Sequence, residues 1–409
     1  MTITRRTLVT GVAAGAAFAS LPRPARAQGA DTLKIGVLND LSGPYKDIAG
    51  AGSAACARQA VEDFDASGKG IKVEIVAADH QNKPDVGTSI ARQWFDRDGV
   101  DLIIDVPTSS VALAVATVAR EKNKVFIVSG AATSDLTGTQ CSPNTLHWTY
   151  DTYMLAKSTG GALVQAGGAS WFFITADYAF GHALQRDTST FVEKAGGKVI
   201  GSKAYPFPGT SDFSSFLLEA QTSGAKVLGL ANAGADTINS IKQAHEFGLS
   251  MTIAGLLMFI SDVHSLGLET AQGLVLTSSF YWDHNDRTRA FSERVKAKMP
   301  SARPTMVQAG VYSGVLHYLK TAQKTGVAQA KKDGAATVAA MKAMPVEDDA
   351  FGKMTIREDG RALTPAFLWR VKKPSESKGP WDYYTLVHET PNDEAYRPLN
   401  EGNCKLVHA

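Results

Sequence analysis

The strongest constraint on the fold is a regular alternation of short β-rich runs with stretches of helical periodicity, and it occurs twice along the chain. Short runs that are apolar on both faces and separated by helices are typical of a parallel sheet covered on both sides. Two such sets predict an α/β fold of two similar lobes. The expected strands are 33–39, 71–79, 101–106 and 124–130 in the first set, and 170–177, 198–206, 225–232, 251–257 and 273–280 in the second.

Helices and short strands continue after both sets are complete, so the chain must return to lobes that already exist. The economical arrangement is a hinge of about three crossings, because no Pro-, Ser- or Gly-rich linker separates the sets. This arrangement predicts an N-lobe of residues 31–150 plus 283–355 and a C-lobe of residues 151–282 plus 356–409.

The first 27 residues have the pattern of an export signal. A charged start precedes an apolar run over about 8–21 and a small-x-small cleavage pattern at 25–27, and Arg5-Arg6 resembles the twin-arginine type. The apolar run is shorter than the ~20 residues that a membrane span needs. We expect export to the periplasm with cleavage after Ala27.

Loss of that segment removes four arginines and no acid, which moves the formal net charge from +2 to −2. A chain this close to neutral has no electrostatic footprint for nucleic acid. The remaining 380 or so residues suffice for two domains with sizeable cores. We therefore expect a soluble monomer in the periplasm that binds no nucleic acid.

Three cysteines allow one disulfide and one free thiol. Cys56 lies among apolar residues at helical spacing, which predicts a small buried core residue. Cys141 and Cys404 both lie in loop-like sequence, TQCSPN and EGNCKL. An oxidising compartment permits a bond, and we predict a Cys141–Cys404 disulfide that ties the C-terminal tail to the body of the protein.

The residues after each strand of the first set form the candidate site, because ligands bind beyond the carboxyl ends of open parallel sheets. Three such loops, 39–45, 107–110 and 130–134, are rich in hydroxyls and small residues. Two of them lead into helix starts, where free N–H groups favour an anion such as a carboxylate. The alternative is that their hydroxyls only cap helices. The candidates are Tyr45, Ser109, Ser110, Ala131, Ala132 and Thr133.

The second set places aromatic and polar residues at the corresponding strand ends, in 176–181, 232–236 and 258–260. Aromatic rings there can cover a flat or apolar ligand. Three more aromatics, Trp148, Tyr150 and Tyr153, lie where the chain enters the second lobe, and interlobe packing is their alternative role. The candidates are Tyr150, Tyr178, Asn232, Ala233 and Phe259.

Six segments in a fixed order carry a family resemblance over nearly the whole mature chain. They are LNDLSGPYKDIAG, VPTSSVALAV, VSGAATSDLT, ITADYAFGHAL, LANAGAD and FGKMTIREDGRAL. Together they resemble the periplasmic receptors of the branched-chain amino acid (Leu/Ile/Val-binding) type of ABC importer. The resemblance implies the type I periplasmic binding protein fold, a small carboxylate or amino-acid ligand, and an ABC permease in the inner membrane as partner.

The resemblance also assigns roles to single residues. In that family the serine-containing loop and an Ala-Ala-Thr turn hold the ligand carboxylate, and these motifs fall here on Ser109, Ser110, Ala131 and Thr133. A tyrosine of the second lobe closes over the ligand, and Tyr178 in DYAFG matches it.

One departure from the family pattern bears on the ligand. Amino-acid receptors of the family hold the ligand ammonium with an acid at a strand end that reads LLMFIS here, so Phe259 or Ile260 takes its place. Burying an ammonium without a partner costs several kcal/mol. The departure favours an aromatic or keto carboxylate, although Asp177, Asp236 or Asp262 could still serve as the missing acid.

Enzyme and sensor functions are the alternatives from other classes. Gly50 to Ala55 fits GxGxxA, the pattern of an exported NAD-dependent oxidoreductase, but about ten residues separate it from the preceding strand. The chain has no GxSxG, GxxxxGK[ST] or HExxH motif, and its nine histidines are scattered. We expect no enzyme activity, cofactor or metal. A ligand sensor built on the same lobes is the remaining alternative to transport.

Overall fold

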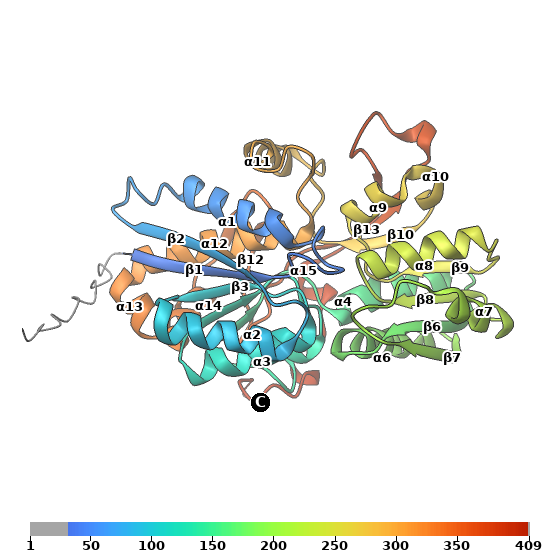
Figure 1. Ribbon diagram of the computed structural model, residues 1–409, viewed down its shortest axis with the longest axis horizontal. Helices are drawn as coiled ribbons and strands as arrows, with labels where there is room; N and C mark the ends of the chain where they lie inside the picture. The colour runs from blue at the N-terminus through green and yellow to red at the C-terminus, as the bar shows by residue number, and fades with distance from the viewer. Residues whose placement is uncertain (1–31, 408–409) are drawn as a thin grey trace, which may run out of the picture.

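The computed structural model describes residues 32–407, and its first lobe is built on a five-stranded parallel sheet of order β2-β1-β3-β4-β5 (Figure 1). Alternate strand residues face opposite layers of helices. Ile35 and Ile104 pack in the core that includes α1 and α12, whereas Ile103 and Phe126 pack in the core that includes α2 and α3. The strands are β1 (Thr32–Asn39), β2 (Lys72–Asp79), β3 (Leu102–Asp105), β4 (Val125–Val128) and β5 (Thr145–His147). The helices are α1 (Gly50–Phe64), α2 (Pro84–Gln93), α3 (Ser109–Glu121), α11 (Asp286–Lys296), α12 (Met306–Thr325), α13 (Val327–Lys332) and α14 (Gly334–Lys342).

The second lobe contains a four-stranded parallel sheet of order β7-β6-β8-β9 with its own helices, at the right in Figure 1. The last strand expected for this sheet instead forms β10 of a separate sheet, in which it pairs antiparallel with β13. The strands are β6 (Ser170–Ala176), β7 (Lys198–Tyr205), β8 (Val227–Ala231), β9 (Thr252–Gly255), β10 (Val275–Ser278), β13 (Ala366–Val371) and β14 (Tyr384–Thr390). The helices are α4 (Thr152–Leu155), α5 (Gly161–Gln165), α6 (Ala179–Lys194), α7 (Ser214–Thr222), α8 (Ala235–Glu246), α9 (Ile260–Leu266) and α10 (Leu268–Ala271).

Parallel sheets flanked by helices confirm the predicted fold class. Between the two sheets the chain passes after β5, after β10, and after the hairpin of β11 (Val346–Asp348) and β12 (Gly352–Met354). The buried hydroxyl of Thr364 connects these passages, since its Oγ1 lies 2.7 Å from the Thr149 carbonyl oxygen, 3.1 Å from Ser279 Oγ and 2.5 Å from the Tyr396 hydroxyl.

The lobe boundaries remain a prediction. Residues near the third passage contact the first sheet: the His147 N–H donates to the Gly360 carbonyl, and the Ala362 N–H donates to the His147 carbonyl. We therefore propose that the last boundary lies between 362 and 366, and not at 356.

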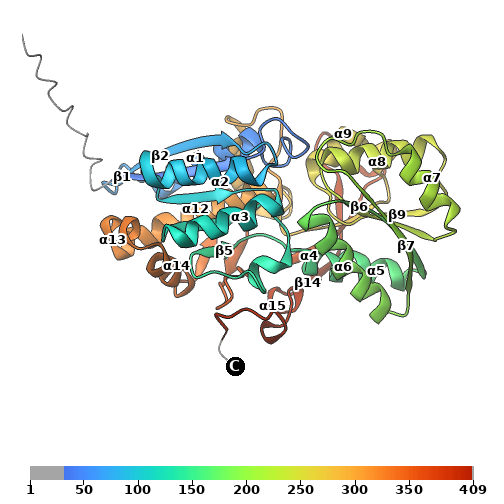
Figure 2. The ribbon, with the colours of Figure 1, turned by 60° about the horizontal axis from the view of Figure 1, so that its bottom comes forward.

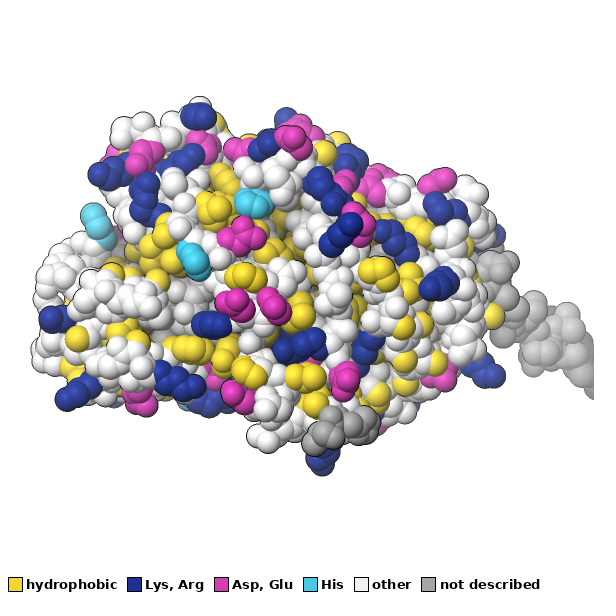
Figure 3. All heavy atoms as spheres, turned by 180° about the vertical axis from the view of Figure 1, so that it is seen from behind, with side chains coloured by type: hydrophobic (Ala, Val, Ile, Leu, Met, Phe, Trp, Pro, Cys, Tyr) yellow, Lys and Arg dark blue, Asp and Glu magenta, His cyan; other side chains and the backbone are white. Residues whose placement is uncertain are grey.

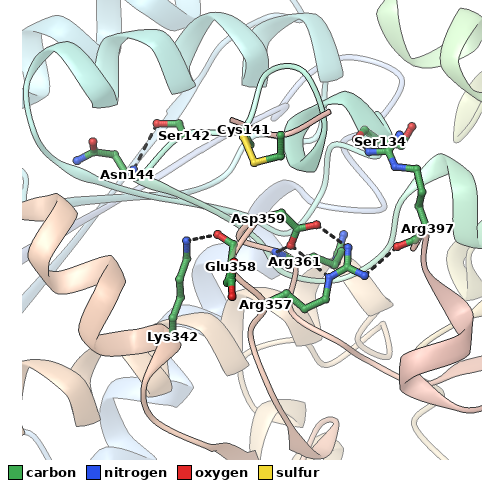
Figure 4. Close-up of a disulfide and its surroundings, with 11 residues drawn as sticks. Ser134, Cys141, Ser142, Asn144, Lys342, Arg357, Glu358, Asp359, Arg361 and Arg397 are labelled. Carbon is green, nitrogen blue, oxygen red and sulfur yellow. Dashed lines mark hydrogen bonds and ion pairs between the residues drawn. A yellow bond between two sulfur atoms is a disulfide. The ribbon is translucent and has the colours of Figure 1, made fainter. Parts of the chain in front are cut away.

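The C-terminal tail is fixed to the first lobe by the predicted disulfide between Cys141 and Cys404, with Cα atoms 5.6 Å apart (Figure 4). The Arg397 guanidinium donates to the Ser134 carbonyl at 3.0 Å, and the Arg357 guanidinium donates to the Arg397 carbonyl at 2.8 Å. The tail includes α15 (Asn392–Ala395) and runs beneath the junction of the lobes in Figure 2. Cys56 is buried and free, as its helical setting predicts.

Neither a membrane-spanning helix nor a metal-ligating cluster occurs among residues 32–407. Within 32–407, no helix is long and apolar enough to cross a bilayer. The same residues contain no group of three or more His, Cys, Asp or Glu side chains placed to hold a metal ion. On the face seen in Figure 3, basic and acidic side chains are interspersed, without a broad patch of one sign. The predicted export signal and the cleavage after Ala27 lie outside the described residues.

Candidate ligand-binding cleft

A small cavity lies between the lobes, where the carboxyl ends of both parallel sheets meet. It measures about 10 Å³ with its lining side chains as they lie, so a ligand larger than a water molecule enters when the lobes open and stays only if those side chains move to make room. Its lining is aromatic and apolar and contains no charged side chain. The lining residues are Tyr45, Ile48, Pro107, Gly130, Ala132, Tyr150, Tyr178, Phe180, Ala233 and Leu257.

Five of the predicted site residues line this cavity, and two of them meet across the lobes. The Tyr45 and Tyr178 hydroxyl oxygens are 2.5 Å apart. Burial raises the pKa of both phenols, so both remain protonated at neutral pH. One proton occupies the bond between the two oxygens, which leaves the pair a second O–H to donate. The predicted residues in the lining are Tyr45, Ala132, Tyr150, Tyr178 and Ala233.

Further contacts join the lobes around this tyrosine pair. The Phe207 ring stacks on Tyr178 with centroids 4.3 Å apart and on Tyr45 with centroids 5.5 Å apart. The Ala235 N–H donates to the Pro44 carbonyl at 3.1 Å. At the base of the cavity the Tyr150 hydroxyl donates to the Gly130 carbonyl at 2.6 Å.

The other predicted residues of the first lobe lie outside the cavity lining. Ser109 Oγ accepts the N–H groups of Ala132 and Thr133, at 3.3 and 3.2 Å. Thr133 Oγ1 accepts the Asp135 N–H, so this hydroxyl caps a short helix as the alternative predicted. Ser110 is half-buried on the first turn of α3. The Ala131 carbonyl accepts a hydrogen bond from His147 Nε2 at 2.8 Å.

Two predicted residues of the second lobe, Asn232 and Phe259, also lie outside the cavity lining. Asn232 Oδ1 accepts from Thr237 Oγ1 at 2.7 Å, and its Nδ2 donates to Ser240 Oγ at 3.2 Å. The Phe259 ring packs edge-on against Tyr150, with centroids 6.1 Å apart, and does not line the cavity. A direct role of these residues in ligand binding stays a prediction.

Sequence reasoning did not single out several apolar residues of the site. Ile48, Phe180, Leu257 and Phe207 have no chemistry that a sequence pattern distinguishes from core packing. Phe180 had the clearest available signal, because it lies two residues after Tyr178, at the start of the helix that follows the first strand of the second lobe.

None of the three acids considered as ammonium ligands lines the cavity. Asp177 is exposed and lies 2.8 Å from His182 Nε2. Asp236 accepts from the Tyr205 hydroxyl at 2.7 Å, and burial raises its pKa to about 6. Asp262 accepts the Phe259 N–H at 3.0 Å at the start of α9, and burial raises its pKa to about 7.

A fourth acid, Asp105, lies buried at the end of β3 behind the cavity. Its φ of 89° and the φ of 52° at Val106 are left-handed values, which are costly for these residues. Ser129 Oγ donates to Asp105 Oδ1 at 3.2 Å, but Oδ2 has no partner among the described residues. Burial outweighs the hydrogen bond and raises the pKa of Asp105 to about 7.

This raised pKa predicts a pH-dependent loss of stability. A carboxyl with a pKa near 3.8 unfolded and about 7 folded contributes stability below pH 4 that is lost as the pH rises to 7. Relative to Asp105→Asn, the wild-type free energy of unfolding should fall between pH 4.5 and 7.5 by about 3 kcal/mol. Urea unfolding of both proteins at the two pH values measures it. Parallel pH profiles would show that Asp105 is ionised throughout.

Comparison with known proteins identifies the family. A family model described as "Periplasmic binding protein" matches residues 32–379. A periplasmic binding protein from Burkholderia mallei is 49% identical, with a TM-score of 0.88, over 92% of this chain and 100% of that one. A branched chain amino acid ABC transporter periplasmic ligand-binding protein from Burkholderia xenovorans is 39% identical, with a TM-score of 0.79, over 91% and 99%.

Two more distant relatives are similar over most of the chain. A Leu/Ile/Val-binding protein homolog 6 from Brucella melitensis is 26% identical over 88% of this chain and 93% of its own. A solute-binding protein from R. palustris in complex with benzoate shares the fold, at 20% identity and a TM-score of 0.78, over 88% and 97%. The chain therefore belongs to the periplasmic binding protein family and is a solute-binding protein of the branched-chain amino acid type of ABC transporter, not an enzyme.

Proposed function

We propose that this protein captures a small carboxylate, an aromatic or keto acid, and presents it to an ABC permease in the inner membrane. The observation that carries the proposal is the lining of the cleft. Aromatic rings from both lobes bound it, with Tyr45 and Tyr150 on one side and Tyr178 and Phe180 on the other, and no acid lines it.

This lining suits a carboxylate without an ammonium group better than an amino acid. The free O–H of the Tyr45–Tyr178 pair can donate to a carboxylate, whereas a ligand ammonium requires an acceptor of its own. Leaving an ammonium unpaired in an apolar site costs several kcal/mol, which removes most useful affinity. Ring faces on both sides of the cleft favour a flat ligand.

The names of the relatives support both ligand classes, aromatic acids and amino acids. The R. palustris protein of the same fold was solved with benzoate, while the Brucella relative is named for leucine, isoleucine and valine. Binding would work by closure: the ligand contacts both lobes, so it stabilises the closed form in which Tyr45 and Tyr178 meet.

Calorimetry with benzoate, 4-hydroxybenzoate, phenylpyruvate, leucine and phenylalanine tests the proposal. We expect at least one of the three simple acids to bind, and both amino acids to bind at least about 100-fold more weakly. Tight binding of an amino acid with no binding of the simple acids would contradict the proposal and would point to an acid that enters the open cleft.

A further inference from the structure

We propose that Asp40 is a positioning residue for lobe closure: it fixes the loop after β1 so that Tyr45 and Pro44 reach the second lobe. The inference rests on the proposed function only in that ligand binding closes the cleft, and it does not depend on the class of ligand. Asp40 itself does not line the cavity.

The Asp40 carboxylate organises the whole loop. It is fully buried, and its Oδ1 accepts the N–H groups of Ser42 and Gly43, at 3.3 and 2.6 Å. Its Oδ2 accepts the Tyr45 N–H at 2.8 Å and Asn82 Nδ2 at 2.9 Å. One side chain therefore accepts three N–H groups of the loop that would otherwise have no backbone partner.

The loop closes tightly around this carboxylate. A Cβ atom at Gly43 would lie 2.5 Å from Asn82 Nδ2 and 2.8 Å from both Asp40 oxygens, so a larger residue there would displace this carboxylate. Asn82 is held in turn, because its Oδ1 accepts from Thr108 Oγ1 and its N–H donates to His80 Nδ1 at 3.0 Å. The loops after β1, β2 and β3 thus form one hydrogen-bonded rim.

Two residues at the end of this loop, Pro44 and Tyr45, make contacts that cross to the second lobe. Tyr45 meets Tyr178 and stacks near Phe207, and the Pro44 carbonyl accepts the Ala235 N–H. No hydrogen bond of the Asp40 side chain reaches the second lobe among the described residues. The hydrogen-bonded route from Asp40 to the second lobe therefore runs through the loop that carries Tyr45.

A double-mutant cycle tests this route. The ligand titrated is benzoate. If the wild type binds leucine and not benzoate, leucine is titrated instead. That result would contradict the proposed ligand class, and the role of Asp40 would still be tested. We expect Asp40→Ala to weaken binding at least about tenfold, mainly through faster dissociation, since it destabilises the closed form. In a Tyr45→Ala background the same change should alter affinity less than about threefold, because only the bond between Pro44 and Ala235 is left for it to disturb.

Asp79→Ala is the matched control. Asp79 lies on the same rim and accepts from Ser42 Oγ at 2.6 Å and the Gln81 N–H at 2.7 Å, but it does not hold the backbone of 43–45. We expect its affinity to stay within about threefold of the wild type. Asp40→Asn, which keeps one acceptor oxygen, should fall between wild type and Asp40→Ala. Additive effects of Asp40→Ala and Tyr45→Ala, or equal losses for Asp79→Ala and Asp40→Ala, would overturn the proposal.

Hydrogen exchange of the ligand-free protein supplies a readout that needs no ligand. Asp40→Ala should speed exchange at the Gly43 and Tyr45 amides while leaving the strand amides of β1 unchanged. Unchanged protection at both amides would show that the carboxylate does not fix the loop, and the inference would fail.

Discussion

Gly234→Ala should lower ligand affinity at least about 100-fold while the ligand-free protein remains folded. A Cβ atom at this position would lie 2.4 Å from the Pro44 carbonyl oxygen of the opposite lobe. The lobes could then not close, and the closed form would lose the Ala235–Pro44 bond and the tyrosine pair. Losing these interactions costs about 3 kcal/mol, which corresponds to about 100-fold in affinity.

A control must separate this clash from backbone strain, because Gly234 has a φ of 60°. Gly248→Ala is suited to that purpose, since Gly248 has a φ of 63° and a Cβ atom there would meet nothing within 4 Å. Gly248→Ala should lose about 1 to 2 kcal/mol of stability, and Gly234→Ala should lose more, because its ψ of −133° lies outside the left-handed α region. Titration of each with a compound that binds the wild type decides the matter: equal affinities for the two variants would show that strain, and not the contact with Pro44, is responsible.

Replacing Cys141 and Cys404 together by alanine should lower the free energy of unfolding by about 2 to 5 kcal/mol. The bond closes a loop of 263 positions, and a long loop restricts the unfolded chain strongly. Urea unfolding in the absence of reductant measures the difference. If the double variant matched the wild type under these conditions, the tail contacts of Arg397 and Tyr396 would suffice to hold the tail.

Alkylation checks the same pairing directly. In native protein purified from the periplasm, a thiol reagent without reductant should label none of the three cysteines, because Cys56 is buried and burial raises the pKa of its thiol. After unfolding without reductant it should label Cys56 alone. Labelling of Cys141 and Cys404 in that sample would contradict the disulfide.

The strands and their layers were predictable because hydrophobic periodicity is a local property of the chain. Both faces of β3 and β4 are buried, so Ile103, Ile104 and Phe126 form runs that indicate a covered parallel sheet. The pairing of β10 was not predictable in the same way. Val275–Ser278 has the same apolar pattern as the other strands of the second set. Its partner β13, however, lies about 90 residues further along the chain.

The site was predictable to the level of loops and less so to that of single side chains. Strand order places the loops that carry Tyr45, Ala132 and Tyr178 together, which is a consequence of topology. Whether a hydroxyl or amide in those loops faces the cleft depends on donors nearby in space. Ser109 and Asn232 face inward because the N–H groups of 132 and 133 and the Thr237 hydroxyl lie within reach.

The disulfide also sets an order of events during biosynthesis. It joins position 141 to position 404, so the first thiol waits for its partner until almost the entire chain has been made. Oxidation is then a late step, and in the finished structure the bonds of Tyr396 and Arg397 hold the same tail against the first lobe. A molecule that was truncated, or whose tail had failed to dock, would keep a free thiol at Cys141. The redox state of that one residue therefore reports whether a given copy has been completed.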